Sequence, residues 1–342
     1  LYVKYIISHE KPDLVIVGDD GGICTSAIKM CKIKGIPTLA VQVGLLTKHA
    51  EKDVLNFLRY KNYLLWRAFS KIIDIRIITR LLLAINFRFI NFEWGSSDPD
   101  IIAVMSEYHR DILVKRGISP NKIVVTGYVL VDEVIDYISS YNAAQKKYLF
   151  EELRLDPQKR IILLLTQPFI EDDLCTATRY MKVLSHIVSS IDTKDYQLII
   201  KPHPREDIRK YESLLEKFGN KNVKIVPRDK NINLIEMILI SDVCVTFTST
   251  SGLLVLACRK PLITLDVFQL PYESAFKGYP LNVTDVSEFS SLLNHLKRNN
   301  FKLTRELYNE VIHRYLYKLD GKASLRIAKI VFKLLKLKTK LG

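Results

Sequence analysis

Several short motifs that define common enzyme classes are missing from the 342-residue sequence. It has no G-x-G-x-x-G and no G-x-x-x-x-G-K-[ST], which disfavours a dinucleotide-dependent oxidoreductase and a P-loop nucleotidase. It also lacks G-x-S-x-G, which disfavours an α/β-hydrolase. None of its five cysteines forms a Cys-x-x-Cys pair. The sequence therefore predicts neither a zinc site nor a disulfide framework, and we expect a reducing compartment.

Long apolar runs are missing as well. No uninterrupted apolar stretch reaches about 18 residues, so the sequence predicts no membrane-spanning helix. No secretory signal is recognisable, and the chain begins at Leu1 instead of Met, inside a stretch with a helical pattern. We therefore expect that an N-terminal piece of the first domain is missing from this sequence.

Acidic residues are scarce in two stretches that carry nearly all of the net charge of +14. Residues 57–92 hold seven basic residues and one acid, and residues 322–342 hold seven basic residues and no acid. Leu, Ile and Phe lie between the charges, as in basic amphipathic helices that bind an anionic membrane surface. The alternative is a helix that packs on the core and exposes a basic face. No recognised nucleic-acid motif accompanies the charge, so no nucleic-acid partner is expected.

Short apolar strands alternate with helical stretches along the rest of the chain. Repeated strand–helix–strand units form parallel sheets, so the sequence predicts an α/β protein of two Rossmann-like domains, the first of them incomplete. The predicted strands are 12–17, 36–42, 101–106 and 122–127, then 160–168, 196–204, 223–227, 242–247, 261–266 and 281–283. We expect an N-terminal domain at 1–150 with a basic insertion at 46–95, a C-terminal domain at 151–320, and a basic helix at 321–342.

Open parallel sheets bind ligands at the carboxyl ends of their strands. The stretch "TSTSG" (248–252) follows one strand and leads into an apolar helix. Its hydroxyls and the free N–H groups of a helix start suit a diphosphate, whereas a plain helix cap needs one hydroxyl. The residues that we expect to bind phosphate at these strand ends are Thr166, Gln167, Lys201, His203, Arg205, Thr248, Ser249, Thr250, Ser251, Gly252 and Asp266.

The stretch "KPHP" (201–204) presents a histidine between two prolines at another strand end. The prolines hold the backbone extended, so the imidazole of His203 can be aimed. It could donate to a phosphate and help to neutralise a leaving group. A lone histidine is more often packed or capped, but the rigid frame with Lys201 and Arg205 beside it favours a site.

The stretch "GDDGG" (18–22) places two carboxylates on a Gly-flanked turn after the first predicted strand. Asp19 or Asp20 could act as the general base that deprotonates an acceptor hydroxyl. Helix capping by one of them and solvation of the other is an equally good alternative. The adjacent pair is not the D-x-D of a metal-dependent site, so it implies no divalent cation.

These stretches together resemble a known group of enzymes. The sequence is similar to the GT-B-fold glycosyltransferases that build microbial surface polysaccharides, including capsule-synthesis enzymes, CDP-glycerol glycerophosphotransferases and bacterial sialyltransferases with His-Pro and Ser/Thr motifs. The resemblance is carried by "IPTLAVQVG", "KIVVTGYVLVDEV", "KPHPRE", "SDVCVTFTSTSGLLVLACRKPLITLD" and "LDGKASLRIAKI". It implies that His203 and the Ser249–Ser251 turn contact the phosphates of a nucleotide donor. It also implies that Asp19-Asp20-Gly21 carries the base.

The resemblance leads us to expect an inverting, metal-independent glycosyltransferase that uses a nucleotide-activated sugar and no cofactor. Its acceptor would be a growing glycan or a lipid-linked saccharide. The two basic stretches would hold it on the cytoplasmic face of the cell membrane. Three alternatives remain open: a UDP-N-acetylglucosamine 2-epimerase-like isomerase, a CDP-glycerol-type glycerophosphotransferase, and a non-catalytic partner that binds a nucleotide sugar.

Overall fold

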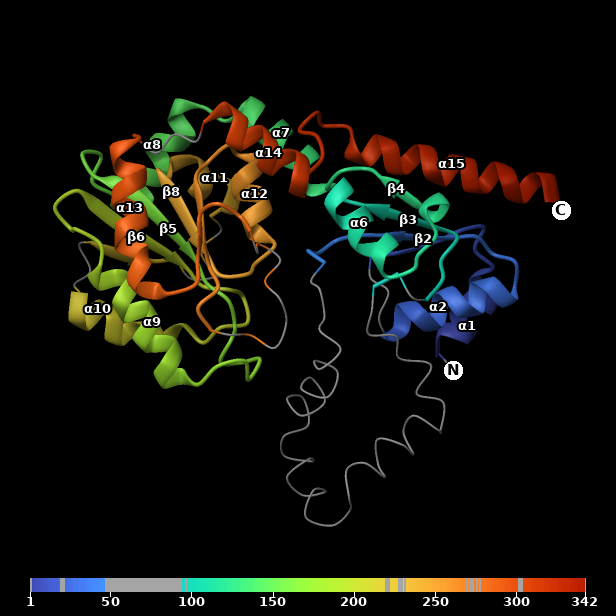
Figure 1. Ribbon diagram of the computed structural model, residues 1–342, viewed down its shortest axis with the longest axis horizontal. Coiled ribbons are helices and arrows are strands. Elements are labelled where there is room, and N and C mark those ends of the chain that lie inside the picture. Colours follow the sequence, from blue (N-terminus) through green and yellow to red (C-terminus); the bar gives the residue numbers. More distant parts are fainter. Residues whose placement is uncertain are drawn as a thin grey trace, which may run out of the picture. The chain divides into compact units, whose positions relative to one another are not determined.

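In the computed structural model, the chain forms two compact units (Figure 1). Leu1–Asp132 and His313–Gly342 form the first unit, and Glu133–Ile312 forms the second. The predicted acidic pair 19–20 and the basic stretch 57–92 lie outside the described residues. The structure describes residues 2–18, 22–46, 94–95, 97–218, 222–226, 230, 232–268, 270, 274, 276, 278–300 and 304–341.

The first unit contains a parallel sheet whose described strands follow the order β1-β2-β3-β4. Ile28, Ile102 and Leu113 are fully buried in the core between this sheet and its helices. Helix α6 ends before Gly117, whose φ of 86° is a left-handed conformation that glycine adopts without strain. The elements are α1 (Tyr2–Glu10), β1 (Val15–Val17), α2 (Gly22–Ile33), β2 (Thr38–Val41), β3 (Ile101–Val104), α6 (Glu107–Lys115), η2 (Pro120–Lys122) and β4 (Ile123–Val125).

The basic C-terminal stretch forms helix α15 (Ala323–Leu341), which packs on the first unit. Ile330 and Leu334 are buried against Leu39 and Ala103 of the sheet. The packed alternative is therefore confirmed for one face of this helix. Within the part of the chain that the structure describes, no helix has both the length and the hydrophobicity that a membrane span requires.

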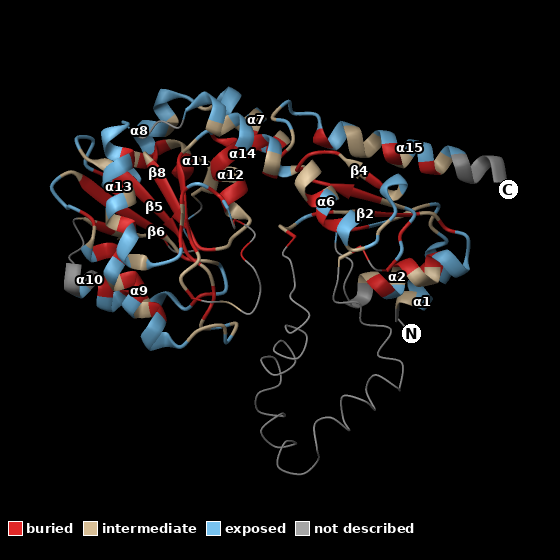
Figure 2. Ribbon diagram, in the orientation of Figure 1, coloured by how far each residue is buried: buried red, intermediate tan, exposed pale blue. Residues whose placement is uncertain are grey.

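The second unit contains a parallel sheet with the strand order β10-β9-β8-β5-β6-β7 (Figure 1). Its strands are almost wholly buried, with helices on both sides (Figure 2). The elements are α8 (Ala143–Glu152), β5 (Arg160–Leu165), α9 (Ala177–Ser189), β6 (Tyr196–Lys201), η3 (Ile208–Tyr211), α10 (Glu212–Phe218), β7 (Val223–Ile225), α11 (Leu234–Ile240), β8 (Val243–Thr246), α12 (Ser251–Ala257), β9 (Leu262–Leu265), β10 (Asn282–Val283), η4 (Val286–Glu288) and α13 (Phe289–Arg298).

Two helices contain the points at which the chain passes from one unit to the other. These are α7 (Leu130–Ser140) and α14 (Arg305–Tyr315). The first passage thus comes before the predicted boundary near residue 150, because α8 contacts α11 of the second unit. Every predicted strand is present, and the prediction of an α/β protein with two Rossmann-like domains is confirmed.

Strand β5 holds the central place in the second sheet. It pairs with β6 on one side and with β8 on the other, and Leu165 lies level with both Lys201 and Thr246. The chain therefore runs outward from β5 to β7 and then returns to build β8, β9 and β10 on the opposite side. Parallel sheets of this kind bind ligands where the direction of winding reverses, which here is the carboxyl edge between β5 and β8.

Candidate functional site

Two predicted residues bridge this reversal point. The side-chain oxygen Oε1 of Gln167, which follows β5, accepts a hydrogen bond from the backbone N–H of Thr248, which follows β8, at 2.7 Å. The bond fixes the start of the 248–252 turn relative to the end of β5. Asp266 follows β9, the next strand outward, and its backbone N–H donates to the oxygen of Val283 at 2.8 Å.

The 248–252 turn is held by its own hydroxyl groups. Ser249 Oγ accepts from the backbone N–H of Ser251 at 3.2 Å and from the Ser251 hydroxyl at 2.8 Å. Because Ser249 accepts both bonds, its own O–H remains a donor. Thr248, Ser249, Thr250 and Ser251 are all partly exposed, so a ligand can reach this turn.

Gly252 is the last residue of the turn, and the packing around it leaves no room for a larger side chain. A Cβ at this position would lie 2.9 Å from the ring carbon Cζ of Phe276 and 3.1 Å from Cδ2 of Leu262. Such distances are too short for a methyl group in a close-packed core. The residue was predicted as part of a phosphate site, and the structure shows that it is also required for the close approach of Phe276.

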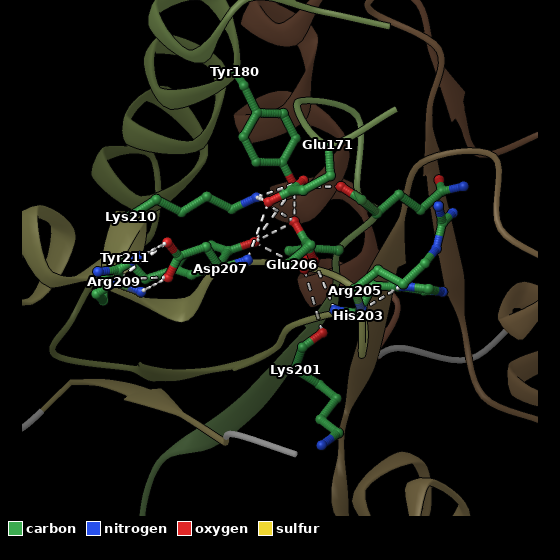
Figure 3. A network of polar contacts seen from close by, with 12 residues as sticks. Glu171, Tyr180, Lys201, His203, Arg205, Glu206, Asp207, Arg209, Lys210 and Tyr211 are labelled. Atoms are coloured by element: carbon green, nitrogen blue, oxygen red, sulfur yellow. Dashed lines mark hydrogen bonds and ion pairs between the residues drawn. The ribbon is translucent and has the colours of Figure 1, made fainter. Parts of the chain in front are cut away.

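The 201–206 turn presents His203 beside the end of β5 (Figure 3). The backbone N–H of Arg205 donates to Nδ1 of His203 at 3.2 Å, and the backbone N–H of Glu206 donates to the His203 oxygen at 2.9 Å. Nδ1 is thus an acceptor, so the neutral ring carries its proton on Nε2. Partial burial and the charge of Arg205 lower the pKa of His203 below its usual value of 6.5, which keeps the ring neutral at pH 7.

A buried carboxylate, that of Glu206, lies next to this histidine (Figure 3). Glu206 accepts hydrogen bonds from the backbone N–H of His203 at 2.7 Å, from Tyr180 Oη at 3.1 Å and from Tyr211 Oη at 2.9 Å. Lys210 Nζ forms an ion pair with it at 2.8 Å. Burial, assisted by the nearby Glu206, raises the pKa of both tyrosines well above 10. Both phenols therefore stay protonated and donate to the carboxylate.

The other predicted residues beside His203 are engaged elsewhere. Thr166 is buried, and its hydroxyl donates to Glu206 and lies 2.9 Å from the hydroxyl oxygen of Tyr211. The guanidinium of Arg205 makes two hydrogen bonds of 2.6 and 2.8 Å to Asp172. The Lys201 side chain extends away from Glu206, and its Nζ lies 3.4 Å from the oxygen of Val226 (Figure 3). Direct phosphate binding by these three residues stays a prediction.

The model of the alpha-2,8-polysialyltransferase (POLYST) family matches residues 22–259, more than half of the chain. The chain belongs to the alpha-2,8-polysialyltransferase family. It is a glycosyltransferase, and the predicted resemblance to polysaccharide-building enzymes of GT-B fold is confirmed at that level. No curated protein sequence matches the chain significantly.

Solved structures with the same fold include two epimerases and a polymerase. UDP-GlcNAc 2-epimerase from Neisseria meningitidis, bound to UDP-GlcNAc, has 16% identity and a TM-score of 0.61, over 97% of this chain and 79% of the epimerase. The epimerase from Methanocaldococcus jannaschii, in complex with UDP-GlcNAc and UDP, has 17% identity and a TM-score of 0.60, over 97% of this chain and 79% of the epimerase. The wall teichoic acid polymerase TagF has 15% identity and a TM-score of 0.51, over 89% of this chain and 69% of the polymerase.

The range matched by the polysialyltransferase family contains both halves of the candidate site. The His203 turn and the 248–252 turn lie within residues 22–259, whereas Asp19, Asp20 and Asp266 lie outside that range. The family relationship therefore covers the predicted phosphate-binding turns and does not extend to the predicted base.

Sequence reasoning missed Glu206, Tyr180, Lys210 and Tyr211. Glu206 is the last residue of the stretch "KPHPRE". It lies three residues after His203, a spacing that suits a hydrogen bond from the His203 N–H to its side chain. The two tyrosines come from α9 and η3, and no local pattern marks them as neighbours. They meet only in the folded structure, where both phenols bond to Glu206.

Replacing Gly252 by Ala tests the packing around the 248–252 turn. Overpacking of a core commonly costs about 1–3 kcal/mol, so Gly252→Ala should lower the free energy of unfolding by about that amount in a urea titration. Gly44→Ala is the control, because no atom lies within 4 Å of the Cβ it would add, and its effect should stay within about 0.5 kcal/mol. Equal midpoints for the two variants would show that Phe276 does not confine Gly252.

Proposed function

We propose that this enzyme is an inverting, metal-independent sialyltransferase that extends a surface polysaccharide. The family membership supports a sialic acid as the transferred sugar. A sialic acid is carried on cytidine monophosphate, so we propose CMP-sialic acid as the donor. The non-reducing end of a growing glycan, free or lipid-linked, would be the acceptor.

The observation that carries this proposal is the fixed state of His203. Its Nδ1 accepts the Arg205 N–H, so the Nε2–H of the neutral ring is left as a donor. The 248–252 turn offers the Ser249 hydroxyl as a second donor. Gln167, which follows β5, holds this turn at the end of that strand. Donors held in place before the reaction stabilise the charge that develops on a leaving phosphate without reorganisation. We therefore propose that both turns bind the donor phosphate.

The proposed base belongs to the other unit. The sequence places Asp19 and Asp20 directly after β1, and a carboxylate there would take the proton of the acceptor hydroxyl. The hydroxyl oxygen would then attack the anomeric carbon opposite the nucleotide, the bond from that carbon to the phosphate oxygen would break, and the configuration would invert. The charge on the departing phosphate would be met by hydrogen-bond donors and not by a metal ion, so chelation with EDTA should leave the rate unchanged.

Membrane binding is a further part of the proposal. Ile330 and Leu334 of α15 are buried, but the opposite face exposes Leu325 (52%) and Phe332 (64%). Lys329 and Lys333 lie among them and are exposed, and residues 322–342 contain no acid. Large apolar side chains among lysines suit the interface of an anionic bilayer. We propose that this face and the basic stretch 57–92 hold the enzyme on the cytoplasmic side of the membrane, near its acceptor.

Replacing His203 by Ala tests the phosphate site. The variant should lose at least about 10²-fold in kcat/KM for the donor, the usual scale for a positioned acid or electrostatic group, and should keep its melting temperature. His186→Ala is the matched control, because that imidazole is exposed on α9. By contrast, Asp19→Asn or Asp20→Asn should abolish transfer and retain nucleotide binding. His203→Ala kinetics equal to those of His186→Ala would refute the assignment.

Vesicle co-sedimentation tests the membrane proposal. Wild-type enzyme should sediment with anionic but not with neutral vesicles, and less so at high salt, because each basic residue near an anionic surface contributes about 1 kcal/mol within a Debye length of about 8 Å. Binding should weaken when Phe332→Ser is combined with Lys329→Gln and Lys333→Gln, and in a separate variant with Arg67, Lys71, Arg76 and Arg80 changed to Gln.

The control for these variants removes charge from the second unit. Lys182→Gln with Lys194→Gln neutralises two exposed lysines there and should leave vesicle binding unchanged. If all variants and the wild type remain in the supernatant with both kinds of vesicle, neither basic segment binds a membrane.

A further inference from the structure

Glu206 is the most completely buried carboxylate near the candidate site. Its side chain is fully covered, and its two oxygens accept from five donors. A buried charge is tolerated only when it is paired and hydrogen-bonded, and here both conditions are met. None of the five donors is the imidazole of His203, so the carboxylate is hydrogen-bonded to that residue through the backbone N–H and not through the ring (Figure 3).

The two oxygens of Glu206 serve different neighbours. Oε1 faces the phenols of Tyr180 and Tyr211 and the ammonium of Lys210, which anchor the carboxylate in the core. Oε2 accepts from the backbone N–H of His203 and from the hydroxyl of Thr166 at the end of β5. One oxygen therefore fixes the glutamate, and the other fixes the turn.

The turn is closed in both directions. The backbone N–H of Glu206 donates to the His203 oxygen at 2.9 Å, while the His203 N–H donates to Oε2 of Glu206 at 2.7 Å. This closure sets Arg205, one of the two residues between them, so that its N–H reaches Nδ1 of the imidazole at 3.2 Å. The bond to Nδ1 is what assigns the proton of the neutral ring to Nε2. Glu206 thus controls the ring through two backbone groups.

We infer that Glu206 is the positioning residue of His203. It would fix the orientation and tautomer of the imidazole through the backbone of the turn, so that Nε2–H points at the donor phosphate. The inference rests on the proposed function of His203, to which it adds the residue that prepares the imidazole for that role. If Glu206 served stability alone, the same buried network would be needed, but a change at Glu206 would not alter the tautomer of His203.

Glu206→Gln is the sharpest change, because it keeps the size of the side chain and replaces one acceptor oxygen by an NH₂ donor. In either orientation of the amide, one group of donors faces the NH₂ and loses its acceptor. The variant should lose roughly 10-fold to 100-fold in kcat/KM, by analogy with the outer hydrogen-bond partners of metal-bound histidines. In a His203→Ala background the same change should cost less than about 2-fold, because residues that act as one unit are not additive.

A spectroscopic measurement separates positioning from stability. With ¹⁵N-labelled histidine, the nitrogen shifts of His203, assigned by their loss in His203→Ala, should report the Nε2–H tautomer in the wild type and a mixture in Glu206→Gln. Leu293→Ala is the matched control: it removes a buried side chain of α13 and should lower the melting temperature while the tautomer and kcat/KM stay unchanged. If Glu206→Gln does not fold, Thr166→Val removes one donor to Oε2 and should shift the tautomer in the same sense.

The outcomes distinguish this inference from the function on which it rests. If His203→Ala transfers normally, the proposed function of His203 fails, whatever the glutamate does. If His203→Ala is impaired but the tautomer of the Glu206 and Thr166 variants equals that of the wild type, Glu206 is a structural residue only. Full additivity of Glu206→Gln and His203→Ala would overturn the inference in the same way.

Discussion

The pairing of β5 with β6 on one side and with β8 on the other is the constraint on which the site depends. It brings Lys201 and Thr246 level with Leu165, although the strands are far apart in the sequence. The turns that follow these strands then meet at one edge of the sheet. Two short links secure them: Gln167 holds the turn after β8, and Thr166 is tied through Glu206 to the turn after β6.

Charge is arranged unevenly around this edge. The cations nearest to the site are largely paired, Arg205 with Asp172 and Lys210 with Glu206 and Glu171. Two of the groups with a donor left for a ligand are neutral: the imidazole of His203 and the hydroxyl of Ser249. Neutral donors in a fixed geometry favour a phosphate whose charge grows during the reaction over one that is merely bound. This arrangement accounts for the function that we propose better than a simple anion-binding surface would.

Much of this could be predicted from the sequence, because the strands are short apolar runs and the helices between them have clear polar ends. The turns "KPHP" and "TSTSG" were identified because strand ends attract ligands, and the structure places them after β6 and β8, the two strands that flank β5. The partners of Glu206 could not be predicted, since Tyr180 and Tyr211 reach it only through tertiary packing. For α15, the pattern indicated an amphipathic helix, but only the contacts of Ile330 with the sheet show which face is covered.

We propose that the edge between β5 and β8 binds the phosphate of a cytidine-activated sugar. The most direct test of this proposal is the melting temperature of the wild-type enzyme with saturating CMP, CDP, UDP or GDP. A ligand that binds only the folded state adds about 2.7 kcal/mol of stability at about 100 times its dissociation constant. We expect the largest increase in melting temperature with CMP, and a much smaller increase in the His203→Ala variant. An increase with UDP alone, or none with any nucleotide, would contradict it.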